Sequence, residues 1–305
     1  MKNRINIILA ALSILTLFLS SCEDVVQVDI DKSDVDLVSV EAYINTKEKD
    51  NVYVKLERTL PVDETAVNPP IHDAIVSISD DQESPNRVTL VEYKTSGIYI
   101  LPKNTKYAAE PGRTYTLNIT LPDGVEISAN DYLQKVEQLD SVKVNLSARG
   151  DYEFLAVFIN SQETPGTGDY YKWDIYINGN MLYEGQNMVI ANDELVDGNY
   201  IYDFEIFTDF ALEEDDKILF KGDTITVEQL SISKAGYDFY MGMTNQAFSG
   251  GPFSVPPANV PGNLTSSDGK RVLGIFSARD ISVGNTVIIG DENFQPLASR
   301  VPGAN

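Results

Sequence analysis

The sequence predicts an all-β protein made of two β-sandwich domains, the second of which also contains one α-helix. Apolar and polar residues alternate over many short segments, which is typical of half-buried strands. Glycine, proline and aspartate separate these segments at the spacing of turns, and no helical period is found before residue 135. Hydrophobic residues make up 43% of the chain, which is enough to fill packed cores and argues against global disorder.

The first β-sandwich domain is expected at residues 37–135. Its first strand is LVSVEAYINT (37–46), in which Val38, Val40 and Ile44 share one face. The other strands of this domain are expected at residues 51–62, 74–79, 87–93, 97–100 and 111–124.

A tyrosine after a turn glycine indicates the kind of sandwich. Gly112 precedes Tyr115, which enters the alternating strand TYTLNIT. This pattern resembles the tyrosine corner of immunoglobulin-like sandwiches, where the ring packs inside and the hydroxyl bonds back to the preceding loop. We therefore expect immunoglobulin-like domains.

The second domain is expected at residues 136–305. It contains strand patterns at residues 141–148, 153–160, 170–179, 199–210, 272–279 and 286–290, and a hairpin pattern at 217–233 about Gly222. The one helical pattern covers residues 233–248, with Ser233 as its N-cap and Ala235, Phe239 and Met243 on its apolar stripe.

Residues 1–21 have the layout of a secretory signal peptide. Lys2 and Arg4 precede an apolar run too short to span a bilayer comfortably, and small residues follow it. The sequence Leu-Ser-Ser-Cys at 19–22 matches the bacterial lipoprotein box, so cleavage is expected between Ser21 and Cys22. The Cys22 sulfur would carry diacylglycerol and its freed amine a third acyl chain, and several acyl chains anchor a protein stably. The alternative is a plain secreted protein with Cys22 in a buried strand.

Residues 22–36 read as an acidic tether. Glu23 and Asp24 directly follow the expected lipidation site and resemble, in part, a Bacteroidota signal for export to the cell surface. We expect a protein anchored in the outer membrane, at the cell surface rather than on the periplasmic face. A tether that stays in the periplasm is the alternative.

The charge balance excludes some partners. The chain has 46 acidic and 23 basic residues and a net charge of −23, so it repels nucleic acid and anionic lipid. Membrane attachment must therefore come from acyl chains on Cys22. Because Cys22 is the only cysteine, an intramolecular disulfide is excluded.

The sequence predicts no catalytic residue, metal site or cofactor, and hence a protein that is not an enzyme. His72 is the only histidine and follows two prolines in a loop, and no nucleophile elbow or phosphate-binding glycine motif occurs. Acidic residues are so abundant that a catalytic carboxylate pair stays open. The acidic loops at 191–199 and 211–217 could hold calcium, although solvated loops are the more favoured interpretation.

Two aromatic or apolar features could contact a ligand or partner. Trp173 could stack on a sugar, but it shares its strand face with Tyr171 and Ile175, which predicts a core position. The proline-stiffened loop at 252–263 could dock a partner or cover its own sheet. The partner-contact residues expected there are Pro252, Phe253, Pro256, Pro257 and Asn259.

Fragments in the same order along the chain resemble a known family. They are SSCEDVVQVDI, LVSVEAYI, VKLERT, PGRTYTL, YYKW, GDTITVEQLSIS with its tyrosine-rich helix, PPANVPGN and LGIFSA. Together they resemble the Bacteroidota lipoproteins of domain of unknown function 4249, for which no catalytic or ligand residues are defined. The resemblance implies a cell-envelope lipoprotein, commonly encoded beside a TonB-dependent outer-membrane receptor. We therefore expect an accessory or binding partner of such a receptor, with a stand-alone glycan- or peptide-binding module and a carboxylate-pair hydrolase as alternatives.

Overall fold

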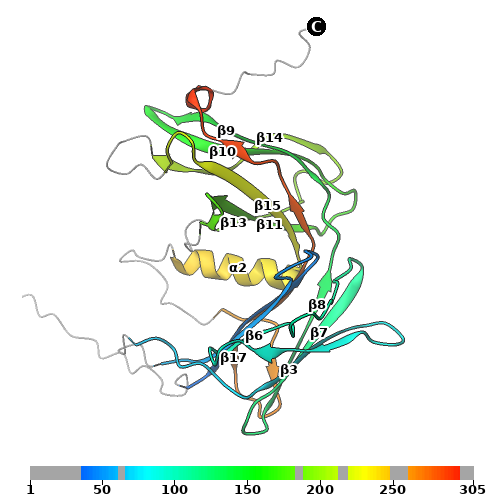
Figure 1. Cartoon of the computed structure of the whole chain (residues 1–305). Coiled ribbons are helices and arrows are strands. Elements are labelled where there is room, and N and C mark those ends of the chain that lie inside the picture. The colour runs from blue at the N-terminus through cyan, green and yellow to red at the C-terminus, as the bar shows by residue number, and fades with distance from the viewer. Residues whose placement is uncertain (1–35, 61–65, 183–187, 212–218, 248–259, 296–305) are drawn as a thin grey trace, which may run out of the picture. The chain divides into compact units, whose positions relative to one another are not determined.

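The computed structural model describes residues 36–60, 66–182, 188–211, 219–247 and 260–295 (Figure 1). These residues form strands in several sheets, with one α-helix among them. The prediction of an all-β fold with one helix is confirmed. The signal peptide at 1–21 and nearly all of the tether at 22–36 lie outside the described residues.

Two five-stranded sheets build the first sandwich. One has the order β17-β1-β2-β6-β5, with β1 at Val38–Asn45, β2 at Val52–Arg58, β5 at Val91–Glu92, β6 at Ile98–Ile100 and β17 at Val272–Arg279. The other has the order β16-β8-β7-β3-β4, with β3 at Ile75–Asp80, β4 at Arg87–Thr89, β7 at Arg113–Thr120, β8 at Glu126–Leu133 and β16 at Thr265–Ser266.

The core between these sheets consists of the inward members of each alternating strand, among them Val40, Val54, Ile78, Leu117 and Phe276. All five are fully buried. Burying a side chain of this size stabilises the fold by about 1.5–3 kcal/mol. The apolar alternation seen in the sequence is therefore the main source of stability in this sandwich.

Strands from late in the chain complete the first sandwich. Residues 265–279, which the sequence division assigns to the second domain, supply β16 and β17 to its two sheets. β17 runs parallel to β1, with Val38 opposite Val272 and Asn45 opposite Arg279. The described residues of both sandwiches accordingly belong to one compact unit.

Gly274 allows β17 to lie this close to β1. Its φ of +96° is in the region that favours glycine, and a Cβ there would lie 1.9 Å from the Val40 carbonyl oxygen. No other residue type fits this position without moving the strands apart.

The second sandwich packs a three-stranded sheet, β14-β10-β9, against a sheet in the order β12-β11-β15-β18. The first has β9 at Leu139–Arg149, β10 at Tyr152–Gln162 and β14 at Tyr200–Ala211. The second has β11 at Tyr170–Ile177, β12 at Asn180–Met181, β15 at Thr224–Ile232 and β18 at Ile281–Val283. Two short strands extend it, β13 at Val189–Asn192 on β11 and β19 at Val287–Ile288 on β15, and a 3₁₀ turn, η3, follows at Asp291–Phe294.

The core position predicted for Trp173 is confirmed. Trp173 is 5% exposed, and its Nε1 donates to Gln229 Oε1 at 3.0 Å. Tyr171 and Ile175 join it in the core. The hairpin predicted about Gly222 is wrong, because β15 pairs with β11 along one edge and with β18 and β19 along the other. Residues 217 and 218 of that prediction lie outside the described residues.

The helix α2 covers Lys234–Ala247, close to the predicted bounds (Figure 1). Its N-cap is confirmed, since the Gly236 amide donates to Ser233 Oγ at 3.1 Å. The predicted packing stripe is wrong: Gly236 and Tyr240 are the buried residues, whereas Met243 is 42% exposed. The helix backbone approaches Ile232 at Gly236, where a Cβ would be in contact with that side chain.

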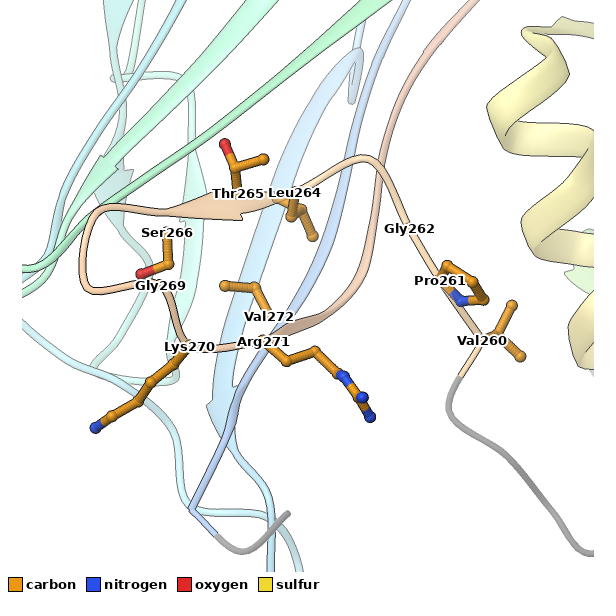
Figure 2. A pocket seen from close by; sticks show the side chains of 10 residues that line it. All are labelled: Val260, Pro261, Gly262, Leu264, Thr265, Ser266, Gly269, Lys270, Arg271 and Val272. Carbon is orange, nitrogen blue, oxygen red and sulfur yellow. The ribbon is translucent and has the colours of Figure 1, made fainter. Parts of the chain in front are cut away.

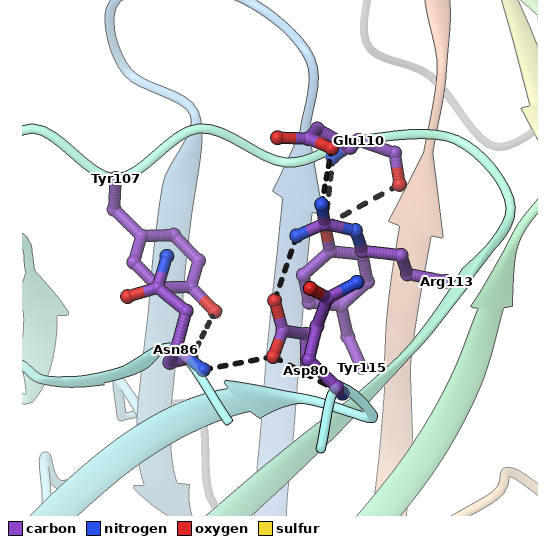
Figure 3. Close-up of polar contacts among 7 residues, drawn as sticks. Asp80, Asn86, Tyr107, Glu110, Arg113 and Tyr115 are labelled. Carbon is purple, nitrogen blue, oxygen red and sulfur yellow. Dashed lines mark hydrogen bonds and ion pairs between the residues drawn. The ribbon is translucent and has the colours of Figure 1, made fainter. Parts of the chain in front are cut away.

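The tyrosine corner has the predicted geometry (Figure 3). Tyr115 is fully buried, and its hydroxyl accepts a hydrogen bond from the Glu110 amide at 2.7 Å. Arg113 beside it pairs with the buried Asp80 at 2.8 Å, and Tyr107 donates to the Asn86 carbonyl at 2.9 Å. These bonds tie the loop before β7 to the end of β3.

Candidate ligand-binding site

A cavity of about 820 Å³ lies between the two sandwiches. It is bounded by the outer face of β1, β2 and β17, by the outer face of β11 and β15, and by α2. The helix contacts β11, β13, β15 and β17, so it closes the space between the two sheets (Figure 1). Its volume is within the range of sites that bind small molecules.

The face of the first sandwich presents aromatic and apolar side chains to the cavity. Tyr43 on β1 lies opposite Tyr53 on β2, and their rings stack with centroids 5.3 Å apart. Leu273 and Ile275 line the same wall from β17. Strand alternation explains this set, because residues of one parity fill the core and those of the other parity face the cavity.

The facing wall of β11 carries buried charges. Lys172 and Asp174 alternate with the core residues of β11, so they lie on its outer face, and they form an ion pair with each other. Each is only 6% exposed, because the first sandwich and α2 cover them. Burial lowers the pKa of Lys172, and the carboxylate of Asp174 opposes that shift.

A second ion pair bridges the two walls. Lys47, in the loop after β1, lies 2.5 Å from Glu228 on β15, and Tyr176 donates to the same carboxylate at 3.2 Å. The two carboxylates on this side of the cavity are therefore each held by a lysine.

Arg279 at the end of β17 differs from these paired charges. Its Nη2 donates to the Tyr240 hydroxyl at 3.1 Å, and its guanidinium carbon lies 4.7 Å from the centre of the Tyr43 ring. Nε is shielded from solvent and has no hydrogen-bond partner among the described residues. Desolvation lowers the pKa of Arg279, but Tyr240 and Asp174 nearby raise it overall, so the group stays charged.

Much of the remaining lining is apolar, although the exposed carboxylates of Glu41 and Asp50 also belong to it. Met181, Leu182 and Met188 contribute from β12 and the segments beside it, and Phe239 and Met243 contribute from α2. Methionine side chains adapt their shape to a bound apolar group. The cavity thus combines an adaptable apolar lining with a cation, Arg279, that has no ion-pair partner among the described residues.

Sequence reasoning missed Lys172, Asp174 and Arg279. The signal was present: Lys172 and Asp174 have the parity opposite to Trp173, and Arg279 has the parity of Leu273 and Ile275. The sequence did not show that the outer faces of β11 and β17 are covered by the opposite sandwich and by α2.

A cluster of carboxylates lies at another place, in the second sandwich. Glu163, Asp169 and Asp193 are buried, with ligand oxygens within 4.8 Å of one another, and this donor set could hold a cation such as calcium. Part of the loop at 191–199 is therefore buried rather than solvated. Residues 212–218 of the other acidic loop lie outside the described residues.

Hydrogen-bond donors of the protein already bind these three carboxylates. Tyr171 donates its hydroxyl to Glu163 at 3.0 Å, the Gly168 amide donates to Asp193 at 2.9 Å, and Gln134 donates to Asp169. Burial, with the neighbouring Glu163 and Asp193, raises the pKa of Asp169 to about 6. The cluster thus fastens the loop that follows β13 to the end of β10.

A second pocket, of about 490 Å³, lies on the surface around β16 (Figure 2). Lys270 and Arg271 line it together with Pro261 and Leu264. Figure 2 shows Lys270 and Arg271 pointing in different directions, so their charges do not converge on one point. This pocket is a weaker candidate for a binding site.

Several residues predicted from the sequence lie outside the described residues. These are Ser21, Cys22, Glu23 and Asp24 of the lipidation and export signals and Pro252, Phe253, Pro256, Pro257 and Asn259 of the partner loop. His72 is described: it lies in a loop with its side chain 42% exposed, as predicted, and its Nδ1 is 2.6 Å from Glu92 Oε1. In the part of the chain that the structure describes, no helix is long and apolar enough to cross a membrane.

Comparison with known proteins identifies the family. No curated protein matches the chain. The model of a family described as a domain of unknown function (DUF4249) matches residues 23–283. Because this match covers most of the sequence and includes both sandwiches, the chain belongs to the family of domain of unknown function 4249.

Proposed function

We propose that this protein is a non-enzymatic lipoprotein of the outer membrane that binds a ligand for a TonB-dependent receptor system. The cavity between the sandwiches is the observation that supports the binding role. It has the size and the apolar lining of a small-molecule site, with a few polar groups to fix orientation. Acyl chains on Cys22 would hold this site at the membrane surface, close to a receptor.

The ion pairs of the two buried carboxylates that line the cavity support binding rather than catalysis. Asp174 is paired with Lys172 and Glu228 with Lys47. A catalytic carboxylate pair must face the substrate, whereas each of these two carboxylates is bound by a lysine.

A stand-alone glycan- or peptide-binding module is the second candidate. The stacked rings of Tyr43 and Tyr53 favour it, since aromatic faces can pack against a sugar ring or a peptide side chain. This module would act at the cell surface without a receptor.

Fractionation of cells that express the full chain or Cys22→Ser tests the proposal. We expect the unmodified chain in the outer membrane, with acyl chains on Cys22 in its mass spectrum and a receptor co-purifying in stoichiometric amount. The serine variant should move to the soluble fraction.

The proposal of a lipid anchor fails if the serine variant stays in the outer membrane or if Cys22 carries a free thiol. Lipidation without any receptor, together with a ligand that raises the melting temperature, would favour the stand-alone module. Protease treatment of intact cells distinguishes the cell surface, where we expect the protein, from the periplasmic face.

A further inference from the structure

We propose that the cavity between the sandwiches binds an organic carboxylate with an apolar body, and that Arg279 is the anchor for its carboxylate group. The inference rests on the binding role proposed above and names the class of ligand. It depends on the environment of Arg279, on the charges around it and on the lining of the cavity.

Arg279 is a largely desolvated cation without a counter-ion. No carboxylate of the described residues lies within ion-pair distance of it, and its contacts are neutral: the Tyr240 hydroxyl and the face of Tyr43. Desolvated charges in proteins are normally paired, because an unpaired one costs several kcal/mol. A ligand anion in the cavity would supply the missing partner.

Of the three basic residues that line the cavity, Arg279 is the one without a carboxylate partner among the described residues, and the lining carboxylates Glu41 and Asp50 are exposed to solvent. Lys172 and Lys47 each have a carboxylate partner, so they add no free positive charge. One uncompensated arginine balances a monoanion, whereas a phosphate dianion would need further cations. A guanidinium binds carboxylates with well-defined geometry through paired N–H groups.

The position of the donors fits this role. Tyr240 holds the guanidinium through Nη2, and Tyr43 supports its face, so the group is oriented before a ligand arrives. Nε has no acceptor in the part of the chain that the structure describes. A pre-oriented donor loses little entropy on binding, which favours affinity.

The rest of the lining selects the body of the ligand. Tyr53, Phe239, Met181 and Met243 form a surface suited to an aromatic ring or a short alkyl chain. The net charge of −23 opposes the approach of an anion from a distance. Binding must therefore come from contacts inside the cavity rather than from long-range attraction.

Calorimetry on the purified full chain with two matched pairs of probes tests this inference. The aromatic pair is 3-phenylpropionate and 3-phenylpropanamide, and the aliphatic pair is hexanoate and hexanamide. We expect one or both carboxylates to bind at least about tenfold more tightly than the corresponding amide, which is about 1.4 kcal/mol. The stronger pair shows whether the natural body is aromatic or aliphatic.

Substitutions then assign the effect to Arg279. Arg279→Met keeps the apolar stem and should remove the preference for carboxylate over amide, while Arg279→Lys should retain part of it. The control Arg149→Met removes an exposed arginine of β9 that is paired with Glu205, and it should bind like the unmodified chain.

A second variant covers the case in which Arg279→Met does not fold. Met243→Trp fills the cavity from a position that is 42% exposed, so it should fold and weaken acid and amide alike. Equal affinity for acid and amide, no binding of any probe at millimolar concentration, or an unchanged preference in Arg279→Met would each overturn the inference. These outcomes do not depend on membrane fractionation, so they are separable from failure of the lipid anchor.

Discussion

Arg279 and Tyr240 join β17 of the first sandwich to α2, which packs on the second. The guanidinium Nη2 lies 3.1 Å from the Tyr240 hydroxyl, and Tyr240 is the most buried large side chain of the helix. The ammonium of Lys172 on β11 lies 5.6 Å from the centre of the same ring. Tyr240 on α2 therefore contacts one residue from each of the two facing walls of the cavity, Arg279 of β17 and Lys172 of β11.

Tyr240→Phe should lower the free energy of unfolding by about 1–2 kcal/mol, because Arg279 Nη2 loses a buried acceptor. Urea denaturation measures this change. The control is Tyr237→Phe, three positions before Tyr240 and less buried, which should change stability by less than about 0.5 kcal/mol. Equal stability of the two variants would show that the bond to Arg279 contributes nothing.

Tyr115→Phe should destabilise the protein by about 1–3 kcal/mol, since the Glu110 amide would be left without its acceptor. Tyr132→Phe on the neighbouring strand β8 is the control, because that side chain is 49% exposed. The midpoint of urea unfolding for both variants tests the tyrosine corner. A shift in Tyr132→Phe as large as that in Tyr115→Phe would contradict this role.

Gly274→Ala should destabilise strongly, because the new Cβ would lie 1.9 Å from the Val40 carbonyl oxygen at a φ of +96°. The left-handed conformation alone costs about 1–2 kcal/mol, and separating β17 from β1 adds to that. Gly269→Ala is the matched control: it has a positive φ and open space, so it should show only the conformational cost. Equal melting temperatures for the two variants would exclude the close approach of β17 to β1.

Asp169→Asn should change how stability depends on pH. The pKa of Asp169 is raised to about 6 in the folded protein from an ordinary value of 3.8. Its contribution to stability is thus fully present below pH 3.8 and is lost as pH rises through about 6. The amide cannot ionise, so relative to the unmodified chain the variant should gain about 1–2 kcal/mol between pH 5 and pH 7.5.

Denaturation at both pH values in the presence of a chelator tests this sign. The control Asp151→Asn removes an exposed carboxylate from the turn between β9 and β10. The free energy of unfolding of Asp169→Asn is compared with that of the unmodified chain at each pH. If the variant is destabilised, and by more at pH 7.5 than at pH 5, the burial of an ionised Asp169 is contradicted.

Local patterns predicted much of this fold. Tyr115 after Gly112 predicted a buried ring with a hydroxyl bond to the loop, and the parity of Trp173 predicted its place in the core. The bounds of α2 followed from Ser233 and the apolar spacing. Each of these features is decided by residues close together in the sequence.

The features that the sequence did not predict depend on contacts between distant parts of the chain. The parallel pairing of β1 with β17 joins two distant parts of the chain, so no local signal marks it. α2 packs through Gly236 and Tyr240 against strands of both sandwiches rather than through the apolar stripe. Lys172 and Arg279 look like ordinary surface charges until both sandwiches and the helix are in place.

The most direct test of the binding site is methionine-methyl NMR of the full chain during titration with 3-phenylpropionate and hexanoate. The chain has five methionines, and Met181, Met188 and Met243 line the cavity, while Met241 on α2 does not. We predict that the methyl signals of the three lining residues shift together with one of the carboxylates and that the Met241 signal moves least. Unchanged signals for all three at saturating carboxylate, or a shift confined to Met241, would contradict ligand binding in this cavity.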